Sequence, residues 1–385
     1  MSRLTPRMQP HAGTIFGDMS ALATRLGAVN LGQGFPDTDG PRELQDAAIR
    51  AIREGHGNQY PPAHGLPELR QAIAEHQSRF YGLEFDWRDE VVVGTGASEV
   101  IGAAVLALAD PGSQVALFDP YFDLYPAVIA LAGASRLSAP LAGPALRPDI
   151  DTLVAQLTPR TRVLLLNSPH NPTGIVFTPD ELQRLAEVAI QHDLVVISDE
   201  AYEHLWFDDH RHIPIATLPG MAERTITIGS AGKTFSYTGW KVGWATGPAD
   251  LIAAVRVVRQ HLSYVSSGPF QWAFAEGLRF PDSYFEEFRA GLAAQRDHLS
   301  AGLAALGMRT LTTQGTYFIT TDVTDAGFAS GTEFCDWIPE HAGVVAIPLS
   351  ALSDHTDAEP YVRWAFCKQP ATLDEALARL TRALG

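Results

Sequence analysis

The stretch TRVLLLNSPHNPTGIVFTPDELQRLAEVAIQHDLVVISDEAY, residues 161–202, predicts the fold of this chain. It begins with an almost continuously apolar run, TRVLLLNSP, and it ends with a second one, LVVISDEAY. Between them lies a helix start signal: Thr178 is a capping residue, Pro179 suits the first helical position, and Glu181 completes a capping box. A buried strand, a helix and a second buried strand form the unit of a parallel sheet.

The same alternation continues on both sides of this unit. Apolar runs at 90–96, 113–120 and 224–232 predict further strands, each next to a helical or glycine-rich segment. After residue 280 a helical stretch at about 281–306 leads into mixed strands and helices. We therefore expect an α/β fold, a mainly parallel sheet flanked by helices, with a smaller α+β domain. The expected limits are 1–38 for an N-terminal arm and the first part of the small domain, 39–280 for the large domain, and 281–385 for the small C-terminal domain.

Composition restricts the classes of function. The chain has 385 residues and a formal net charge of −16. This charge argues against general nucleic-acid binding and against binding to an anionic membrane surface. The N-terminus has no apolar signal-peptide core, and no apolar window is long and uninterrupted enough to span a bilayer. Cys335 and Cys367 form no metal-binding pattern, and we expect free thiols in a cytoplasmic protein, although one disulfide is possible.

The segment GSAGKTFSYTGWKVGW, residues 229–244, carries two lysines in a glycine-rich setting. Gly232-Lys233-Thr234 resembles the end of a nucleotide-binding P-loop, but the first glycine that this motif needs falls on Thr227, so we reject a triphosphate site. A lysine directly after a buried strand suits Schiff-base chemistry with a carbonyl compound. The alternative is a solvated loop lysine.

Further polar residues follow the predicted strands. Asp199 ends the run LVVIS at the edge of the sheet where open α/β sheets bind ligands, and Tyr202 follows it. In GTGASE, residues 94–99, Glu99 stands where a dinucleotide-binding motif needs its third glycine. The backbone N–H groups of that turn still begin a helix and predict an anion site, with an ordinary turn as the alternative.

Three more candidates carry weaker signals. Asn171 lies in NSPHNPTG, which also reads as a simple turn. Phe122 can stack on a flat ring, although core aromatics are commoner. Arg363 interrupts the apolar run YVRWAF and needs a partner, either a substrate carboxylate or an acid of this chain.

Taken in order, these motifs resemble those of the fold-type I, class I pyridoxal-phosphate aminotransferases. The similarity is closest to the branch of kynurenine/glutamine and methionine aminotransferases and covers nearly the whole chain. The motifs that carry it are NLGQGFPD, NQY, NSPHNPTG, SDEAYE, GSAGKTFSYTGWKVGW, GTYF, AIPLS and YVRWAF. The resemblance implies pyridoxal 5′-phosphate as cofactor, an amino acid donor, a 2-oxo acid acceptor and a homodimer.

The resemblance also implies roles for single residues. Lys233 would form the Schiff base and shuttle the proton, and Asp199 would hold the ring nitrogen. Tyr202 and Asn171 would bond the ring oxygen. The residues implied around the phosphate and the ring are Gly96, Ala97, Ser98, Phe122, Ser230, Lys241 and, from the neighbouring subunit, Tyr60. Those implied near the substrate are Phe16, Gly34, Asn171, Tyr264 and Arg363. Ser98 stands where the kynurenine branch has an aromatic residue.

We expect ping-pong transamination of a neutral, fairly large amino acid: methionine, glutamine, an aromatic residue or kynurenine. No second arginine is evident near the implied pocket, so aspartate should be a poor substrate. The alternative is a pyridoxal-phosphate C–S β-lyase of the cysteine-conjugate or cystathionine type. A remote alternative is a non-catalytic aminotransferase-like sensor.

Overall fold

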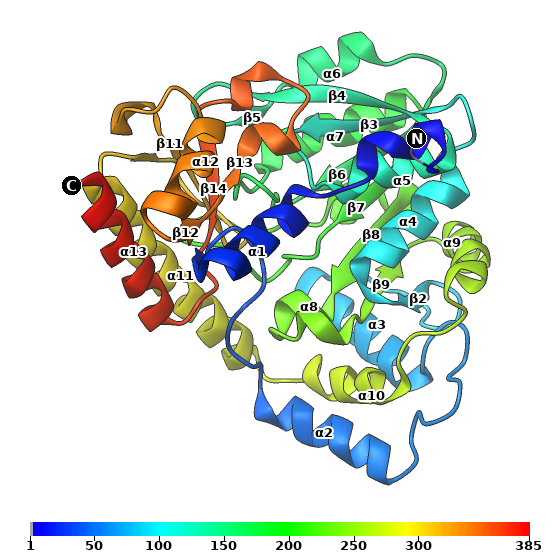
Figure 1. Ribbon diagram of the computed structural model, residues 1–385. Helices are drawn as coiled ribbons and strands as arrows, with labels where there is room; N and C mark the ends of the chain where they lie inside the picture. The colour runs from blue at the N-terminus through cyan, green and yellow to red at the C-terminus, as the bar shows by residue number, and fades with distance from the viewer. Residues whose placement is uncertain (1–2) are drawn as a thin grey trace.

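The computed structural model describes residues 3–385, and the chain folds around one eight-stranded sheet (Figure 1). The strand order is β2-β9-β8-β7-β6-β3-β4-β5. The strands are β2 (Val91–Gly94), β3 (Gln114–Asp119), β4 (Ser135–Ala142), β5 (Arg147–Pro148), β6 (Thr161–Asn167), β7 (Val195–Asp199), β8 (Thr225–Ser230) and β9 (Gly243–Thr246). The sheet is mainly parallel, as expected, but β9 runs antiparallel to β2 and β8, and β5 runs antiparallel to β4.

Helices cover both faces of this sheet because its central strands are apolar on both sides. On β6, Val163 and Leu165 pack in one hydrophobic cluster with α4, α5 and α9, whereas Leu164 and Leu166 pack in another with α6 and α7. The helices are α4 (Gly96–Leu108), α5 (Leu124–Ala132), α6 (Ile150–Gln156), α7 (Pro179–Gln191) and α9 (Ala249–Leu262). A third cluster joins β2 to α2 (Arg42–Arg53), α3 (Pro67–Tyr81) and α10 (Gly268–Gly277).

The expected helix start at Thr178 is present. In α7 the Thr178 hydroxyl accepts the Glu181 N–H at 3.2 Å, and the Glu181 carboxylate accepts the Thr178 N–H at 2.8 Å, so the capping box is formed. α3 ends at Tyr81, and Gly82 caps it in the left-handed conformation. α2 ends at Arg53, and Gly55, with a positive φ of 82°, lies two residues beyond the helix.

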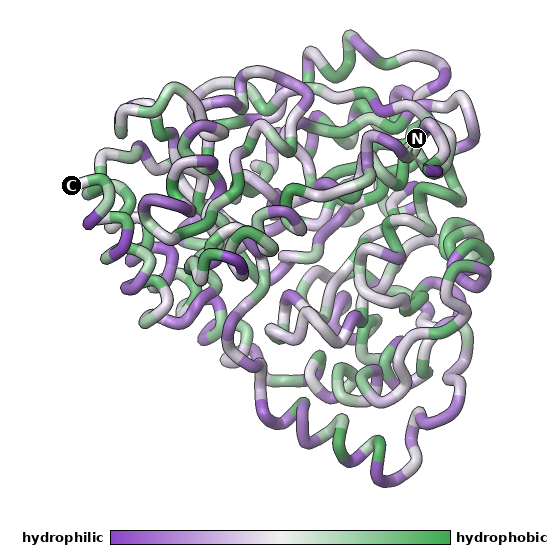
Figure 2. Tube along the Cα trace, viewed as in Figure 1, coloured by the Kyte–Doolittle hydropathy of each residue, from purple (hydrophilic) through white to green (hydrophobic). Residues whose placement is uncertain are grey.

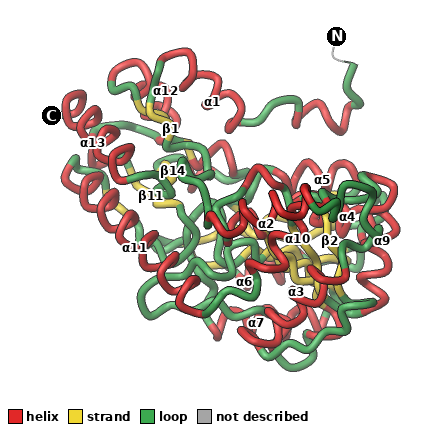
Figure 3. Tube along the Cα trace, turned by 90° about the horizontal axis from the view of Figure 1, so that it is seen from below, coloured by secondary structure: helices red, strands yellow, loops and turns green. Residues whose placement is uncertain are grey.

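A separate antiparallel sheet of four strands, in the order β10-β11-β14-β13, forms the smaller region. Its strands are β10 (Arg309–Thr310), β11 (Phe318–Asp322), β13 (Ile347–Pro348) and β14 (Tyr361–Ala365). α1 (Ile15–Leu26), α11 (Asp282–Ala305), α12 (Gly331–His341) and α13 (Pro370–Leu384) gather on this side of the molecule (Figure 3). β1 (Val29–Asn30) pairs with β12 (Val344–Val345), so the start of the chain joins its last third. The domain limits at residues 38 and 280 stay predictions.

The remaining segments are short. η1 (Pro6–His11) lies against α5, and α8 (Ala231–Thr234) directly follows β8. Other 3-10 helices occupy connections: η2 (Ile215–Thr217), η3 (Ala222–Arg224), η4 (Thr238–Trp240), η5 (Thr324–Ala326), η6 (Leu349–Leu352) and η7 (Thr356–Ala358). Hydrophilic and hydrophobic residues alternate along the outer helices α2 and α13 (Figure 2). Within residues 3–385, no helix is long and apolar enough to cross a membrane.

Candidate active site

A cavity of about 380 Å³ lies where β6, β7 and β8 end, between the large sheet and β14 of the small sheet. Both sheets and the N-terminal segment contribute to it. The lining residues are Phe16, Gln33, Gly34, Phe35, Gly96, Ala97, Ser98, Ile101, Phe122, Asp123, Asn167, Asn171, Asp199, Ala201, Tyr202, Ser230, Gly232, Lys233, Thr238, Lys241, Val242, Phe318 and Arg363. The topology thus brings together most of the residues singled out in the sequence.

Lys233 projects into the cavity from α8, one turn after the end of β8. Its Nζ lies 2.7 Å from the Tyr317 hydroxyl and 3.2 Å from the Gly34 carbonyl oxygen. Burial lowers the pKa of Lys233 to about 8, and the nearby cations Arg363 and Lys241 act in the same direction. A neutral amine is therefore available near neutral pH, which proton transfer and attack on a carbonyl carbon both require.

Asp199 is buried at the end of β7 and is held from two sides. The Tyr125 hydroxyl donates to its Oδ2 at 2.6 Å, and the Ala201 N–H donates to its Oδ1 at 3.1 Å. The Asn167 amide donates to the Asp199 carbonyl oxygen at 2.9 Å. Burial raises the pKa of the Asp199 carboxyl because it penalises the charged form, and a cationic N–H donor beside it would restore the carboxylate.

Arg363 lies buried on β14, and the Asp123 carboxylate is near enough to act on its charge. Its Nη1 donates to Asn171 Oδ1 at 2.9 Å, and its Nη2 donates to the Gly32 carbonyl oxygen at 2.6 Å. The guanidinium stacks on the rings of Phe318 and Phe16, at 4.0 and 4.6 Å. No ion pair within residues 3–385 involves Arg363, and its buried Nε has no hydrogen-bond partner there. An ion pair with an acid of this chain is therefore not its role, and a ligand carboxylate suits this position.

An anion site forms at the start of α4. Gly96 has a φ of +76°, and a Cβ atom there would lie 3.1 Å from Lys241 Nζ, so the lysine ammonium packs against the helix N-terminus. Backbone N–H groups of a helix start, a lysine and the nearby hydroxyls of Ser98 and Ser230 all favour an anion.

The family model for aminotransferases of class I and II matches residues 27–380. The chain belongs to this family. A Mycobacterium tuberculosis protein named as a probable N-succinyldiaminopimelate aminotransferase is 50% identical over 386 residues, which cover 97% of each chain. Methionine aminotransferase of Escherichia coli is 38% identical over 96% of each chain. Mouse kynurenine–oxoglutarate transaminase 3 is 35% identical over 96% of this chain and 88% of its own.

Solved structures agree with this placement. The N-succinyldiaminopimelate aminotransferase of Mycobacterium tuberculosis superimposes with a TM-score of 0.97 at 50% identity, over 99% of this chain and 100% of its own. The fold is that of the fold-type I aminotransferases, as expected. The protein is a pyridoxal-phosphate-dependent aminotransferase, an enzyme whose substrates are an amino acid and a 2-oxo acid.

The cavity of the aminotransferase fits this cofactor. Pyridoxal phosphate needs an anion site for its phosphate, an acid for its ring nitrogen and an amine for its aldehyde. The start of α4 with Lys241 offers the first, Asp199 the second and Lys233 the third. A Cβ atom on Gly232 would lie 3.0 Å from Thr238 Cα, so the aminotransferase has a tightly packed backbone beside Lys233.

Two expected residues lie outside the cavity of their own chain. The Tyr60 side chain is 79% exposed and that of Tyr264 is 48% exposed, and their rings pack edge to face at 5.4 Å. Within the described part of the chain the lining contains neither of them. The expected place of Tyr264 near the substrate and the expected role of Tyr60 toward a neighbouring subunit both stay predictions.

Sequence reasoning missed several residues that the aminotransferase places at the site. Tyr125 sits in an apolar helix and resembles a core aromatic, and Asn167 resembles a turn residue. Asn167 is the register partner of Asp199 on the neighbouring strand, so a polar residue at the same strand end was the available signal. Gln33, Asp123, Thr238 and Phe318 also line the cavity without having been singled out.

Proposed function

We propose that this aminotransferase takes its amino group from a neutral amino acid with a fairly large side chain, such as methionine, glutamine, an aromatic amino acid or kynurenine. The observation that carries the proposal is that, in the part of the chain that the structure describes, Arg363 is the only arginine that lines the cavity. It binds the α-carboxylate, and no second guanidinium is left for a side-chain carboxylate. Phe16, Phe35, Phe122 and Phe318 make much of the remaining wall apolar.

The residues around the ring act as follows in this proposal. When bound, pyridoxal phosphate supplies an electron-accepting ring that stabilises negative charge on the substrate α-carbon. Lys233 would take the proton from the substrate α-carbon with its neutral amine and deliver it to the C4′ carbon of the cofactor. Asp199, oriented by Tyr125, keeps the ring nitrogen protonated. Tyr202 and the Nδ2 of Asn171 donate to the ring oxygen.

The remaining groups position the cofactor and the substrate. Asn171 Oδ1 accepts a hydrogen bond from the Arg363 guanidinium, so the Asn171 side chain connects the residue that binds the substrate carboxylate to the cofactor ring. Phe122 stacks on the ring, and Gly34 closes the substrate side with its backbone. The phosphate is held by Gly96, Ala97, Ser98, Ser230 and Lys241. These contacts bind the cofactor, orient the substrate and exclude water from the site.

A second candidate substrate follows from the similarity at 50% identity. N-succinyldiaminopimelate, named for the Mycobacterium tuberculosis relative, presents an α-amino-carboxylate on a long chain. Its further carboxylates need cationic or amide partners, and the Gln33 amide in the cavity lining is one such partner. The neutral side chain stays the first proposal because the cations in the cavity, Lys233, Lys241 and Arg363, already have roles.

Single-turnover absorbance measurements with one donor at a time test this proposal. The expected order places methionine, phenylalanine, glutamine or kynurenine well above aspartate, with N-succinyldiaminopimelate as a separate arm. A rate with aspartate above those with methionine and phenylalanine contradicts the proposal, and a rate with N-succinyldiaminopimelate above all others replaces it by the second candidate. Pyruvate and ammonia release from cysteine conjugates without an acceptor would instead show a β-lyase.

We also infer a homodimer in which Tyr60 reaches the phosphate site of the partner subunit, because the exposed Tyr60 and Tyr264 rings form an aromatic pair on the surface. Light scattering on the purified protein gives the oligomeric state. Mixing Tyr60→Ala and Lys233→Ala chains then tests the shared site, since one intact site per mixed dimer should restore activity. A cytoplasmic location is part of the same proposal, and cell fractionation tests it.

A further inference from the structure

A cluster of ionisable side chains lies outside the active-site cavity. His76 comes from α3, and Glu203 and His204 follow Tyr202 in the segment after β7. All three are buried, and one potential metal-ligating atom of each lies within 4.8 Å of the others. None of them lines the active-site cavity in the described part of the chain.

The two histidines face each other through the same ring nitrogen. His76 Nε2 lies 2.8 Å from His204 Nε2. Burial lowers the pKa of His76 to about 3 and that of His204 well below its usual value, so both imidazoles are neutral. A neutral imidazole is the form that binds a metal ion. The rings of Phe80 and Phe285 pack on His204 at 4.8 and 4.4 Å and give the pair a dry, apolar wall.

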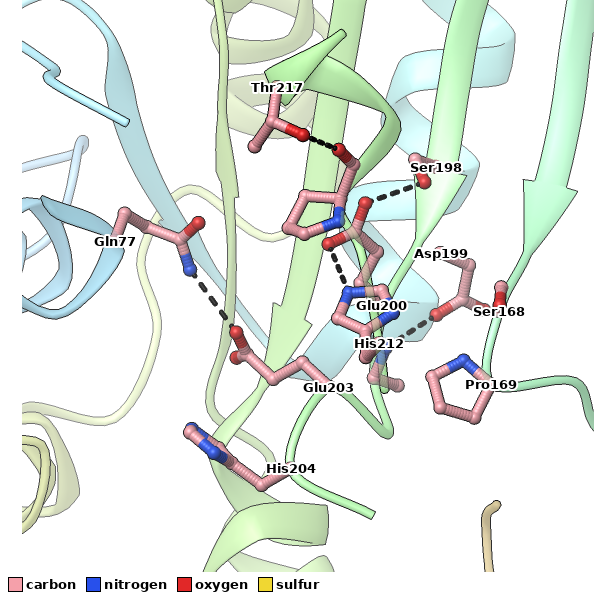
Figure 4. Close-up of polar contacts among 12 residues, drawn as sticks. Gln77, Ser168, Pro169, Ser198, Asp199, Glu200, Glu203, His204, His212 and Thr217 are labelled. Carbon is pink, nitrogen blue, oxygen red and sulfur yellow. Dashed lines mark hydrogen bonds and ion pairs between the residues drawn. The ribbon is translucent and has the colours of Figure 1, made fainter. Parts of the chain in front are cut away.

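The oxygen atoms of the cluster are only partly satisfied, although the Tyr81 hydroxyl also lies against the Glu203 carboxyl. Gln77 Nε2 donates to Glu203 Oε2 at 3.3 Å, as Figure 4 shows, with His204 beside this pair. Glu203 Oε1 and Gln77 Oε1 are buried and have no hydrogen-bond partner of good geometry within residues 3–385. Burial and the neighbouring Glu200 raise the pKa of Glu203 to about 8. Unpartnered buried acceptors are costly, and a cation would satisfy them.

We propose that His76, Glu203 and His204 form a buried metal site that binds one zinc ion. The ligands are the two Nε2 atoms and one Glu203 oxygen, with the Gln77 amide oxygen or a water as the fourth. Imidazole and carboxylate ligands in tetrahedral arrangement suit Zn²⁺. At tetrahedral Zn–N distances of about 2.1 Å the two nitrogens stand about 3.4 Å apart, so the rings must separate from the present 2.8 Å, and the Glu203 oxygen, now within 4.8 Å of them, must move inward.

The ion would be structural. It ties α3 to the segment that begins with Asp199 and contains Tyr202, so it would hold the cofactor-binding end of β7 against the outer helices. His76 is only 1% exposed and His204 only 4%, so the ion enters during folding. Zinc bound by native ligands adds its binding energy to the folded state.

Metal analysis of the full-length holoenzyme tests this proposal. The protein is made with zinc in the medium, dialysed against buffer treated to remove metals, and measured by inductively coupled plasma mass spectrometry. We expect about one zinc per chain in the wild type and less than about a tenth of that in H76Q and H204Q. H170Q is the matched control: His170 is equally buried but bonds Thr173 Oγ1 outside the cluster, so this variant should keep its zinc.

A second set of measurements distinguishes loss of the zinc ligands from misfolding of the variants. E203Q keeps the shape and the hydrogen bond to Gln77 but cannot ionise to give an anionic ligand, and its zinc content should fall while its circular dichroism spectrum is unchanged. Unfolding the wild type in chelator and refolding it with Co²⁺ should give visible absorption bands of a tetrahedral ion. The proposal is overturned if the wild type holds no zinc after growth in zinc and after refolding in zinc, or if H76Q and H204Q hold as much as the wild type.

Discussion

At the residue scale, the pKa of Lys233 near 8 sets the behaviour of the site. Only the neutral amine attacks the aldehyde of the cofactor. The rate at which cofactor-free protein takes up pyridoxal phosphate should therefore rise between about pH 7 and about pH 8 and level off by about pH 9. Stopped-flow absorbance measures this rate. A lysine with the ordinary pKa of 10.5 would keep gaining speed through pH 10, and that result would contradict the buried setting.

Arg363 gives a second prediction at this scale. Arg363→Lys keeps the charge, but an ammonium cannot serve Asn171, Gly32 and a substrate carboxylate with the fixed geometry of a guanidinium. We expect kcat/KM for the best amino acid to fall by about 10²-fold, with the cofactor spectrum unchanged. Steady-state kinetics with saturating 2-oxo acid measures it. An unchanged kcat/KM would show that the carboxylate binds elsewhere.

The sequence predicts the chemically distinctive residues of the site but not their supports. Lys233, Asp199 and Arg363 stand out because charged residues adjoin or interrupt apolar strands. Tyr125 and Tyr317 do not stand out, because an apolar neighbourhood hides their hydroxyls. Their partners Asp199 and Lys233 lie 74 and 84 positions away in the chain. Only the folded topology makes these contacts.

At the scale of elements, the capping box of α7 makes a measurable contribution. Thr178→Ala removes the acceptor of the Glu181 N–H, while Arg147 still holds the Glu181 side chain. The free energy of unfolding should fall by about 1 kcal/mol. Thr178→Ser keeps the oxygen and should remain close to wild type. Urea unfolding of the cofactor-free protein compares the three, and equal midpoints for Ala and wild type would show that the cap is not needed.

Strand β9 shows where sequence patterns stop being informative. It has four residues and begins with glycine, which is too short for a period of two to be seen, and it runs against the neighbouring strands. The longer runs of β3, β6 and β7 were predicted because fully buried strands are continuously apolar. The position of β9 in the sheet depends on its pairing with β2 and β8, which are distant in the sequence, and not on a local sequence pattern.

Gly243 in β9 gives the prediction that belongs to this element. A Cβ atom there would lie 2.4 Å from the Ala97 backbone N and 2.6 Å from the Gly96 backbone C, at the N-terminus of α4. Gly243→Ala should displace that helix start and weaken cofactor binding by about tenfold or more. Gly239→Ala is the control, since nothing lies within 4 Å of its Cβ position. Fluorescence titration gives both affinities, and equal values would disprove the role of this close approach.

At the scale of the whole molecule, buried histidines make the fold sensitive to acid. Burial lowers the pKa of His76 and His170 to about 3 and that of His204 well below its usual value, whereas each takes up a proton near pH 6.5 once unfolded. The unfolded state thus binds more protons below pH 6.5, and stability falls as the pH falls. Each histidine contributes up to about 1.4 kcal/mol per pH unit.

This contribution is measured by comparing wild type with H170Q. Unfolding midpoints of the cofactor-free, chelator-treated protein are taken between about pH 7 and about pH 4. The variant should lose stability less steeply than wild type below pH 6.5, because one proton uptake on unfolding is gone. Parallel curves for the two proteins would mean that His170 is protonated in the folded state as well.

The active site itself is a property of the whole chain. Lys233 and Asp199 come from the large sheet and its strand ends, and Arg363 and Phe318 come from the small sheet. Gly34 comes from the N-terminal segment that follows β1. The motifs that predict these site residues are spread along nearly the whole chain, and the family model likewise matches residues 27–380. The preferred donor is not encoded in any single motif, because side-chain selectivity depends on a few pocket contacts of small energy.

Borohydride reduction of the holoenzyme, followed by peptide mapping, tests the central claim most directly. Reduction attaches the cofactor permanently to the amine that holds it, and we predict the label on one residue, Lys233, within the segment that follows β8. Lys233→Ala should carry no label and should lose at least about 10²–10⁴-fold in turnover. A label on Lys241 or on another lysine, or no label on the wild type, would contradict the account.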